Sequence, residues 1–228
     1  MGEKDHSDKR LAGEGELAYV PLDAIRRVLR DNGADPIARA ELLADLCRIN
    51  TLYMIMQAGS GHIGSSFSSM DLICWLWTAW LVDPNSSNRD TAGADTYFSS
   101  KGHDAPALYS LLIALEKLDA SLLHRLRRLG GLPGHPDVET PFIATNTGSL
   151  GMGISKAYGM ARAQRLNGGR ERSAAGRIVV MLGDGELQEG QVWESLQPAA
   201  NERLGEIIVI VDHNKLQSDS AVSAVSDL

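Results

Sequence analysis

The stretch VVMLGDGELQEG, from Val179 to Gly190, decides the fold of this protein. An apolar run typical of a buried strand leads into Gly-Asp-Gly, and an acidic segment with a helical pattern follows. This helix is predicted from about Glu189 to Asn201, with Pro198 kinking it or ending it early. A second strand-like run, Ile207 to Asp212, comes next. Two strands joined by such a helix form a β-α-β unit, which predicts an α/β fold with a parallel sheet flanked by helices.

The rest of the chain also alternates between helical and strand-like segments. A helix is predicted from Ile37 to Gln57, with an apolar face made of Leu42, Leu43, Leu46, Ile49, Leu52, Tyr53 and Met56. A second helix, apolar on nearly all sides and therefore buried, is predicted from Met70 to Val82. Further predictions are strands at Thr96–Ser99 and Arg177–Leu182, a loop feeding a helix within Ser100–Leu115, and a helix at Lys156–Leu166. Without a visible repeat or linker, we expect one domain over residues 19–228 behind a disordered head, residues 1–18.

Composition limits the classes of function. Of 228 residues, 43% are hydrophobic and 22% charged, as is typical of a soluble globular protein. The net charge of −7, with no block rich in Lys or Arg, argues against nucleic-acid binding. The N-terminus lacks the apolar core of a signal peptide, and Met70–Val82 is too short to span a membrane. Cys47 and Cys74 are expected to be buried free thiols, and we predict a cytoplasmic location.

Asp184 and Asn214 follow the two strands of the β-α-β unit. Ligands of parallel sheets bind at the carboxyl ends of the strands, and the glycines beside Asp184 let the backbone approach a ligand closely. Carboxylate, amide and main-chain oxygens suit Mg²⁺ or Ca²⁺ rather than zinc. The common nucleotide fingerprints are absent, and DHNKLQSD lacks the glycine and glutamate of an EF-hand. The sequence therefore predicts a metal ion that in turn holds a phosphate group.

The pair GDGELQEG and VDHNK resembles the thiamine diphosphate fingerprint, which usually ends in Asn-Asn and here ends in His213-Asn214. SGHIGSS, SKGHDAPALY, LPGHPD and NTGSLGMGIS follow the order found in the N-terminal, diphosphate-binding half of transketolases. Together these motifs cover roughly Ile49 to Asp227. The resemblance implies the thiamine diphosphate-binding fold, with thiamine diphosphate and Mg²⁺ (or Ca²⁺) as cofactors.

The resemblance also implies which residues would hold the cofactor. Asp184, the Asn214 side chain and the main-chain oxygen of Leu216 would bind the metal, which bridges to the diphosphate. Gly185 would bring its backbone to the diphosphate. The residues that would line the cofactor, with their backbone at its aminopyrimidine end, are Gly148, Ser149 and Leu150.

Three histidines, each next to a glycine in a loop, are the candidate catalytic residues. By resemblance, His103 would contact the diphosphate region, and His62 and His135 would face the substrate. Histidine suits this task because its charge changes near neutral pH and it can carry a proton for a sugar hydroxyl. Glu189 corresponds to a family glutamate at the subunit interface. The other histidines, His6, His124 and His213, are assigned no catalytic role.

The implied activity is transfer of a two-carbon ketol unit from a ketose (phosphate) donor to an aldose acceptor. The family also needs a pyrimidine-binding domain, and the chain ends at AVSAVSDL, soon after the last motif. We therefore expect the N-terminal subunit of a split transketolase, joined to a C-terminal, pyrimidine-binding subunit in an α2β2 heterotetramer, although a fragment of a longer product stays open. Two other functions also stay open: the α subunit of a 2-oxo acid dehydrogenase or another thiamine diphosphate-dependent lyase or synthase, and a non-catalytic regulatory partner. LPGHPD and SKGH argue against the first, and the intact site residues argue against the second.

Overall fold

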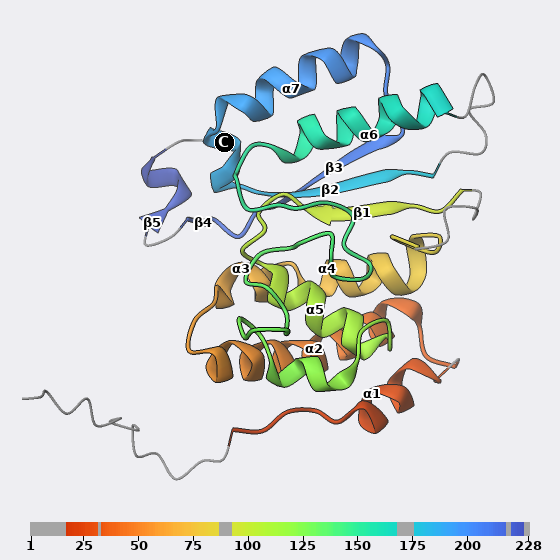
Figure 1. Cartoon of the computed structure of the whole chain (residues 1–228), viewed down its shortest axis with the longest axis vertical. Coiled ribbons are helices and arrows are strands. Elements are labelled where there is room, and N and C mark those ends of the chain that lie inside the picture. Colours follow the sequence, from red (N-terminus) through yellow and green to blue (C-terminus); the bar gives the residue numbers. More distant parts are fainter. Residues whose placement is uncertain (1–16, 32, 87–92, 168–175, 218–219, 226–228) are drawn as a thin grey trace, which may run out of the picture.

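The computed structural model describes residues 17–31, 33–86, 93–167, 176–217 and 220–225 (Figure 1). Most of the predicted head, residues 1–16, lies outside the described residues. Three strands, β1 (Thr96–Ser99), β2 (Ile178–Gly183) and β3 (Ile207–Asp212), form a parallel sheet in the order β1-β2-β3. In its register, Val179 pairs with Tyr97 on one side and with Ile208 on the other. The strand positions and the parallel sheet confirm the predictions from sequence.

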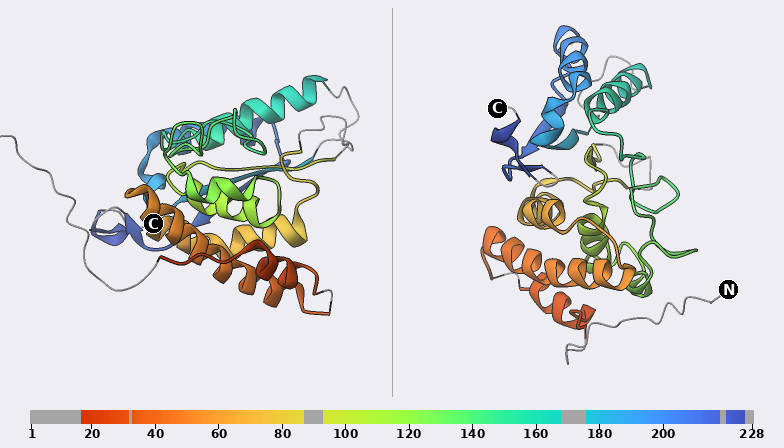
Figure 2. Two further views of the ribbon diagram at one scale, coloured as in Figure 1. Left: turned by 60° about the horizontal axis from the view of Figure 1, so that its bottom comes forward. Right: turned by 90° about the vertical axis from the view of Figure 1, so that its left-hand side faces the viewer.

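Helices cover both faces of this sheet, as Figures 1 and 2 show. On one face, α4 (Met70–Trp75) and α5 (Ala105–Ala114) lie next to the sheet, and α2 (Pro36–Ala58) and α1 (Leu22–Leu29) pack outside them (Figure 1). The other face is covered by α6 (Gly153–Asn167) and α7 (Gly190–Asn201). Side chains of β2 alternate between the layers: Val179 and Met181 join the first core, and Val180 and Leu182 join the second. A parallel sheet with helices packed on both of its faces confirms the α/β fold.

Short elements complete the description. They are α3 (Ile63–Ser68), the π-helical turn η1 (Leu76–Trp80), the 3-10 turns η2 (Ala120–His124), η4 (Gly185–Gln188) and η5 (Val222–Ala224), and the antiparallel pair β4 (Leu216–Gln217) and β5 (Ser220–Ala221). The pair β4–β5 lies beside the carboxyl ends of the sheet strands, at the left of Figure 1. Among the helices in the described part of the chain, none has the length and hydropathy needed to cross a membrane.

Helix α2 forms where it was predicted, but only part of its predicted apolar face is buried, namely Leu43, Tyr53 and, in part, Leu46. The Asp35 side chain accepts hydrogen bonds from two backbone N–H groups at the start of the helix, and Gly59 ends it in a left-handed conformation. Four residues of that face are exposed by 38–57%: Leu42, Ile49, Leu52 and Met56. The helix packs against α1, α4 and α5, so the positions of these neighbours decide which side is covered. The buried side includes the small residues Ala40, Ala44 and Cys47, which allow close approach.

Two further predictions about helices need correction. The segment Met70–Val82 is not one regular helix: α4 ends at Trp75 and η1 follows, where the Leu81 N–H donates to the Leu76 carbonyl at 2.8 Å. Pro198 does not end α7 early, since the helix continues to Asn201. Pro198 lies in the last turn, where its missing N–H removes a single helical bond, and its carbonyl still accepts from Glu202 N–H at 3.0 Å. Cys47 and Cys74 are free and buried, as predicted.

Candidate functional site

All three sheet strands deliver a polar motif to the same edge of the sheet. The segment SKGH (100–103) follows β1, Asp184 follows β2, and Asn214 follows β3. The backbone ladder continues past the strand ends, because Ser100 N–H donates to Met181 O at 2.8 Å and Asp184 N–H donates to Asp212 O at 3.2 Å. Parallel pairing therefore brings segments that are distant in the sequence to one site.

The turn that carries Asn214 is tied directly to Asp184. The Asp184 carboxylate is 2% exposed; its Oδ1 accepts from Gly185 N–H at 2.9 Å, and its Oδ2 accepts from Lys215 N–H at 2.6 Å. Asn214 Oδ1 accepts from Leu216 N–H at 2.9 Å. Gly185 packs against Gln217, whose Cβ and Oε1 would both lie 3.0 Å from a Cβ at position 185. The structure thus places the turn that carries Asn214 and Leu216 directly against Asp184.

This set of oxygen atoms fits a hard divalent cation. It combines a buried carboxylate with an amide oxygen and main-chain carbonyl groups, and it contains no thiolate. Within the described ranges there is no cluster of three or more His, Cys, Asp or Glu side chains that could hold a metal by themselves. A cation here would therefore need further oxygen atoms from its cofactor or from water, as Mg²⁺ commonly does.

A buried ion cluster lies beneath the strand ends, and no pattern in the sequence predicted it. Lys101 Nζ lies 2.7 Å from Asp212 Oδ2 and 3.3 Å from Asp104 Oδ2, and it donates to Ser65 O at 3.3 Å. Ser68 Oγ donates to Asp212 Oδ2 at 2.5 Å. Burial lowers the pKa of Lys101, but the two carboxylates outweigh burial and raise it, so the ammonium stays charged. The cluster fixes the ends of β1 and β3 and the start of α5 relative to one another.

The three candidate histidines lie on loops around this edge. The rings of His62 and His103 are 4.8 Å apart between centroids, and His135 Cδ2 would lie 3.0 Å from a Cβ at Gly148. Burial lowers the pKa of His103, and repulsion from His62, Lys101 and His135 lowers it further, although Asp104 opposes the shift. His103 is therefore neutral at neutral pH, with one ring nitrogen able to accept a proton.

The SKGH loop and the glycine loop 146–153 touch backbone to backbone. Gly102 has a φ of +65°, and a Cβ there would lie 2.5 Å from Gly148 N and 2.7 Å from Gly148 Cα. Beside this contact is a cavity of about 240 Å³ lined by Ser100, Asn146, Thr147, Ser149, Met152, Gly153 and Lys156. The buried Thr147 Oγ1 has no hydrogen-bond partner among the described residues. A cavity whose wall is mostly apolar surface, with an unpaired hydroxyl next to a glycine backbone, fits a small heterocyclic ligand that carries a few polar groups.

Residues 39–227 match the model of the family described as transketolase, thiamine diphosphate binding domain. The chain belongs to this family. It is 36% identical over 188 residues to the 6-deoxy-6-sulfo-D-fructose transketolase subunit SqwG of Clostridium sp. (strain MSTE9), with 81% of this chain and 66% of that protein covered. It is 31% identical over 193 residues to an apulose-4-phosphate transketolase subunit of Phocaeicola vulgatus. That alignment covers 82% of this chain and 65% of that protein.

Solved transketolases share the fold. The transketolase from Leishmania mexicana gives a TM-score of 0.71 at 25% identity, with 92% of this chain and 30% of that one covered. A Pichia stipitis transketolase mutant in complex with fructose 6-phosphate gives a TM-score of 0.72 at 26% identity. The match covers 86% of this chain and 29% of that one. The chain thus spans just under two thirds of the two relatives named as subunits, and less than a third of these full-length enzymes.

In this transketolase-family domain, the predicted interface residue lies on the surface beside the glycine loop. Glu189 is exposed, and its Cβ would lie 2.9 Å from a Cβ at Gly151. Large apolar side chains nearby in sequence or space are also exposed: Leu150 by 39%, Met152 by 38% and Trp193 by 54%.

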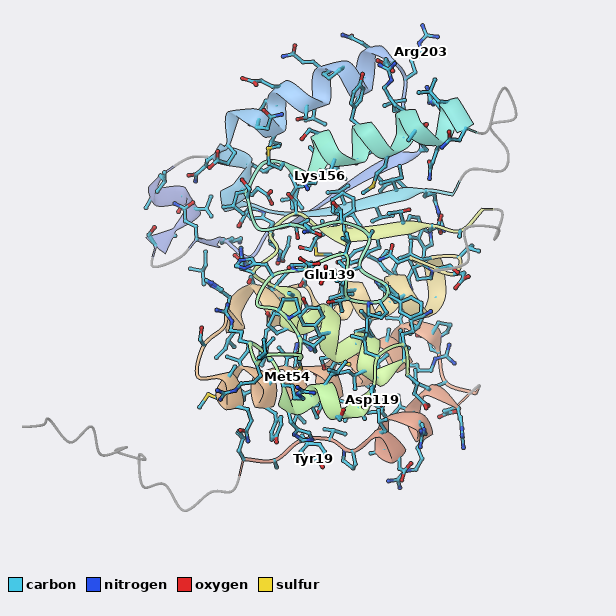
Figure 3. All side chains as sticks on the ribbon, in the orientation of Figure 1. Tyr19, Met54, Asp119, Glu139, Lys156 and Arg203 are labelled. Atoms are coloured by element: carbon cyan, nitrogen blue, oxygen red, sulfur yellow. The ribbon has the colours of Figure 1, made fainter. Side chains whose placement is uncertain are left out.

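His124 lies away from the site, in agreement with the structural role expected for it. Its Nδ1 is 2.8 Å from Tyr53 Oη, and its ring packs edge-on against Tyr19 and Tyr53. Figure 3 shows Tyr19 on the outer side of the helical layer, well away from Lys156 at the cavity. The exposed ring of His213 lies 4.0 Å from Asp184 Oδ2, and this position gives no reason to assign it a catalytic role.

Glu186 is the second feature of this transketolase-family site that sequence reasoning missed. Its carboxyl group is 2% exposed, although it follows the Gly-Asp-Gly turn directly. Burial raises its pKa, and hydrogen bonds from Ser100 and from the N–H groups of Gly151 and Gly183 oppose that shift. A sequence pattern could not find it, because the partners that bury it come from other parts of the chain.

Proposed function

We propose that this chain is the diphosphate-binding subunit of a split, thiamine diphosphate-dependent transketolase. It would transfer a two-carbon ketol unit from a ketose (phosphate) donor to an aldose acceptor. The observation that carries the proposal is that three neighbouring strands of a transketolase-family domain end in the SKGH, GDG and DHN motifs at one edge. Two relatives that bear the name transketolase subunit support the split arrangement.

The proposed cofactor site uses the oxygen atoms of the Asp184 turn. Asp184, Asn214 Oδ1 and the main-chain oxygen of Leu216 would bind Mg²⁺ (or Ca²⁺), and Gly185 would present its backbone to the diphosphate. Thiamine diphosphate, when bound, supplies the carbanion chemistry that cleaves and re-forms the carbon–carbon bond. The backbone that would line its aminopyrimidine end is that of Gly148, Ser149 and Leu150, beside the cavity of about 240 Å³.

The proposed substrate side of the site is formed by histidines. His103 would contact the diphosphate region, while His62 and His135 would face the sugar. A neutral imidazole can accept a proton from a sugar hydroxyl at one ring nitrogen and return it later in the cycle. The lowered pKa of His103 supports this assignment, because it keeps that ring neutral at neutral pH.

The proposed partner is a C-terminal, pyrimidine-binding subunit in an α2β2 heterotetramer. Exposed Glu189 and the apolar side chains of Leu150, Met152 and Trp193 would lie at the contact, since exposed apolar groups of this size beside a site are typical of interfaces. We further propose that residues 19–228 form one domain and that the assembly is cytoplasmic.

The test is to purify the chain alone and together with a pyrimidine-binding subunit encoded by a neighbouring gene. We expect the chain alone to be inactive, and the mixture to form a larger complex by light scattering and to transfer ketol units from ketose phosphates with Mg²⁺ and thiamine diphosphate. A monomer that turns over ketose phosphates without a partner would refute the proposal. Turnover of pyruvate in place of ketoses would favour a 2-oxo acid dehydrogenase subunit.

A further inference from the structure

Glu186 connects three segments that meet behind the cavity. Its Oε1 accepts from Gly151 N–H at 2.7 Å and from the hydroxyl group of Ser100, and its Oε2 accepts from Gly183 N–H at 3.2 Å. Ser100 Oγ in turn accepts from Gly153 N–H at 3.0 Å. We call this set of four hydrogen bonds the Glu186 clip. It joins the residue after β1, the last residue of β2 and the glycine loop that leads into α6.

The glycine loop fits tightly around the clip. A Cβ at Gly153 would lie 2.4 Å from both Cβ and Oγ of Ser100, and a Cβ at Gly151 would lie 2.9 Å from Glu189 Cβ. Gly151 has a φ of +82°, which glycine adopts without strain. These contacts leave no room for a side chain at Gly151 or Gly153, so the loop backbone packs directly against Ser100 and Glu189.

Glu186 contacts the wall of the cavity but does not line it. Ser100 and Gly153 line the cavity, whereas Glu186 contacts it only through them. The carboxylate also lies at the N-terminus of α6, where free N–H groups and the helix dipole favour a negative charge. The 15 residues of α6 make that terminus a full helix end.

We infer that Glu186 is a positioning residue that holds the backbone of the loop 148–153 in place for the cofactor before the cofactor binds. This inference rests on the proposed function, which assigns that loop to the aminopyrimidine end of thiamine diphosphate. The clip itself is a property of the cofactor-free chain, so its effect on the loop can be measured without cofactor.

The test uses Glu186→Gln, which keeps the size of the side chain but places an amide N–H₂ against at least one N–H donor of the clip. Ser100→Ala is the second variant, because it removes the hydroxyl group and leaves the Glu186 side chain intact. Glu202→Gln is the matched control. Glu202 is an exposed carboxylate that accepts from Tyr158 Oη at 2.5 Å and from Arg162 at 2.9 Å, away from the cavity.

The first measurement is hydrogen exchange of backbone amides in the cofactor-free chain. We expect the amides of Gly151 and Gly153 to exchange about tenfold faster in Glu186→Gln, because a bond to a carboxylate has been lost locally. The Gly183 amide, which donates to Glu186 Oε2, should also exchange faster, while the amides of residues 178–182 in β2 stay unchanged. Ser100→Ala should speed exchange at Gly153 in the same way. Unchanged exchange at both glycines, or faster exchange by one common factor throughout the sheet, would overturn the inference.

The second measurement is binding of thiamine diphosphate to the assembled complex at several Mg²⁺ concentrations. We expect Glu186→Gln to weaken binding about tenfold at every Mg²⁺ concentration, with the metal dependence of the parent and no change in Glu202→Gln. Affinity equal to that of the parent would overturn the inference. If the parent itself bound no thiamine diphosphate, the proposed function would fail, and the exchange data would still decide whether the clip positions the loop.

Discussion

Replacing Gly102 by alanine should damage the site far more than replacing Gly59, although both glycines have similar backbone conformations. The φ values are +65° at Gly102 and +71° at Gly59. The cost of a left-handed conformation, roughly 1–2 kcal/mol, therefore applies to both variants. The two positions differ in the space around an added Cβ atom. At Gly59 nothing lies within 4 Å of an added Cβ, whereas at Gly102 the Cβ would lie 2.5 Å from Gly148 N.

The size of the difference follows from this contact. Ordinary contact begins near 3.4 Å, so the backbone at Gly148 must move by about 0.9 Å (3.4 − 2.5). Overpacking of this kind costs about 1–3 kcal/mol. We thus expect a loss in unfolding free energy of about 1–2 kcal/mol for Gly59→Ala and about 2–5 kcal/mol for Gly102→Ala. Ordinary domains have unfolding free energies of about 5–15 kcal/mol, so Gly59→Ala stays folded, and Gly102→Ala stays folded where the parent lies above about 5 kcal/mol.

Urea denaturation of the two variant chains measures the stability difference, and assays of the assembled complex measure the functional one. A misplacement of about 1 Å near reacting groups can cost about 10²-fold in rate, which is the loss we expect for Gly102→Ala. Gly59→Ala should retain the parent rate. Equal stability losses in the two variants, together with parental activity in Gly102→Ala, would show that the contact between the two loops does not position the cofactor.

Three other perturbations test separate parts of the structure. Asp184→Ala should abolish metal-dependent retention of thiamine diphosphate, because the metal loses its one charged protein ligand; cofactor binding equal to the parent's at equal Mg²⁺ would contradict the metal assignment. His103→Ala and His135→Ala should each lower turnover by about 10²- to 10⁴-fold with little change in melting temperature; parallel losses of folding and activity would point to structural roles instead. Arg177→Met should destabilise the chain by about 3 kcal/mol in urea, because the buried Asp95 carboxylate keeps its backbone N–H donors but loses its charged partner at 2.5 Å. Burial raises the pKa of Asp95, but hydrogen bonds from Arg177 and from backbone N–H groups outweigh it and lower the pKa, so this stability should be present above about pH 4 and be lost as pH falls through the lowered value. Stability of Arg177→Met equal to the parent's at pH 7 would refute this account.

The sequence by itself determined the fold class, the positions of the three sheet strands and the edge at which we propose the site. Short apolar runs followed by glycine and polar motifs predict strands and their ends, because both signals are local in the chain. For the same reason, the metal-binding turn and the three loop histidines could be proposed before any contact was known. The roles proposed for Asp184, Asn214 and the histidines depend on the family motifs, which are also contiguous stretches of sequence.

Tertiary structure alone decided which charged groups are buried and which face of a helix is covered. Lys101 and Asp212 contact each other although they are 111 positions apart in the sequence, and Ser100 and Glu186 although they are 86 apart. No periodic pattern in the sequence predicts either contact. The exposed side of α2 was likewise set by where α1, α4 and α5 pack, not by its own hydrophobic pattern. Burial depends on partners that the fold brings from distant parts of the chain, and these partners determine whether a lysine or a glutamate is a solvated surface group or a fixed part of the site.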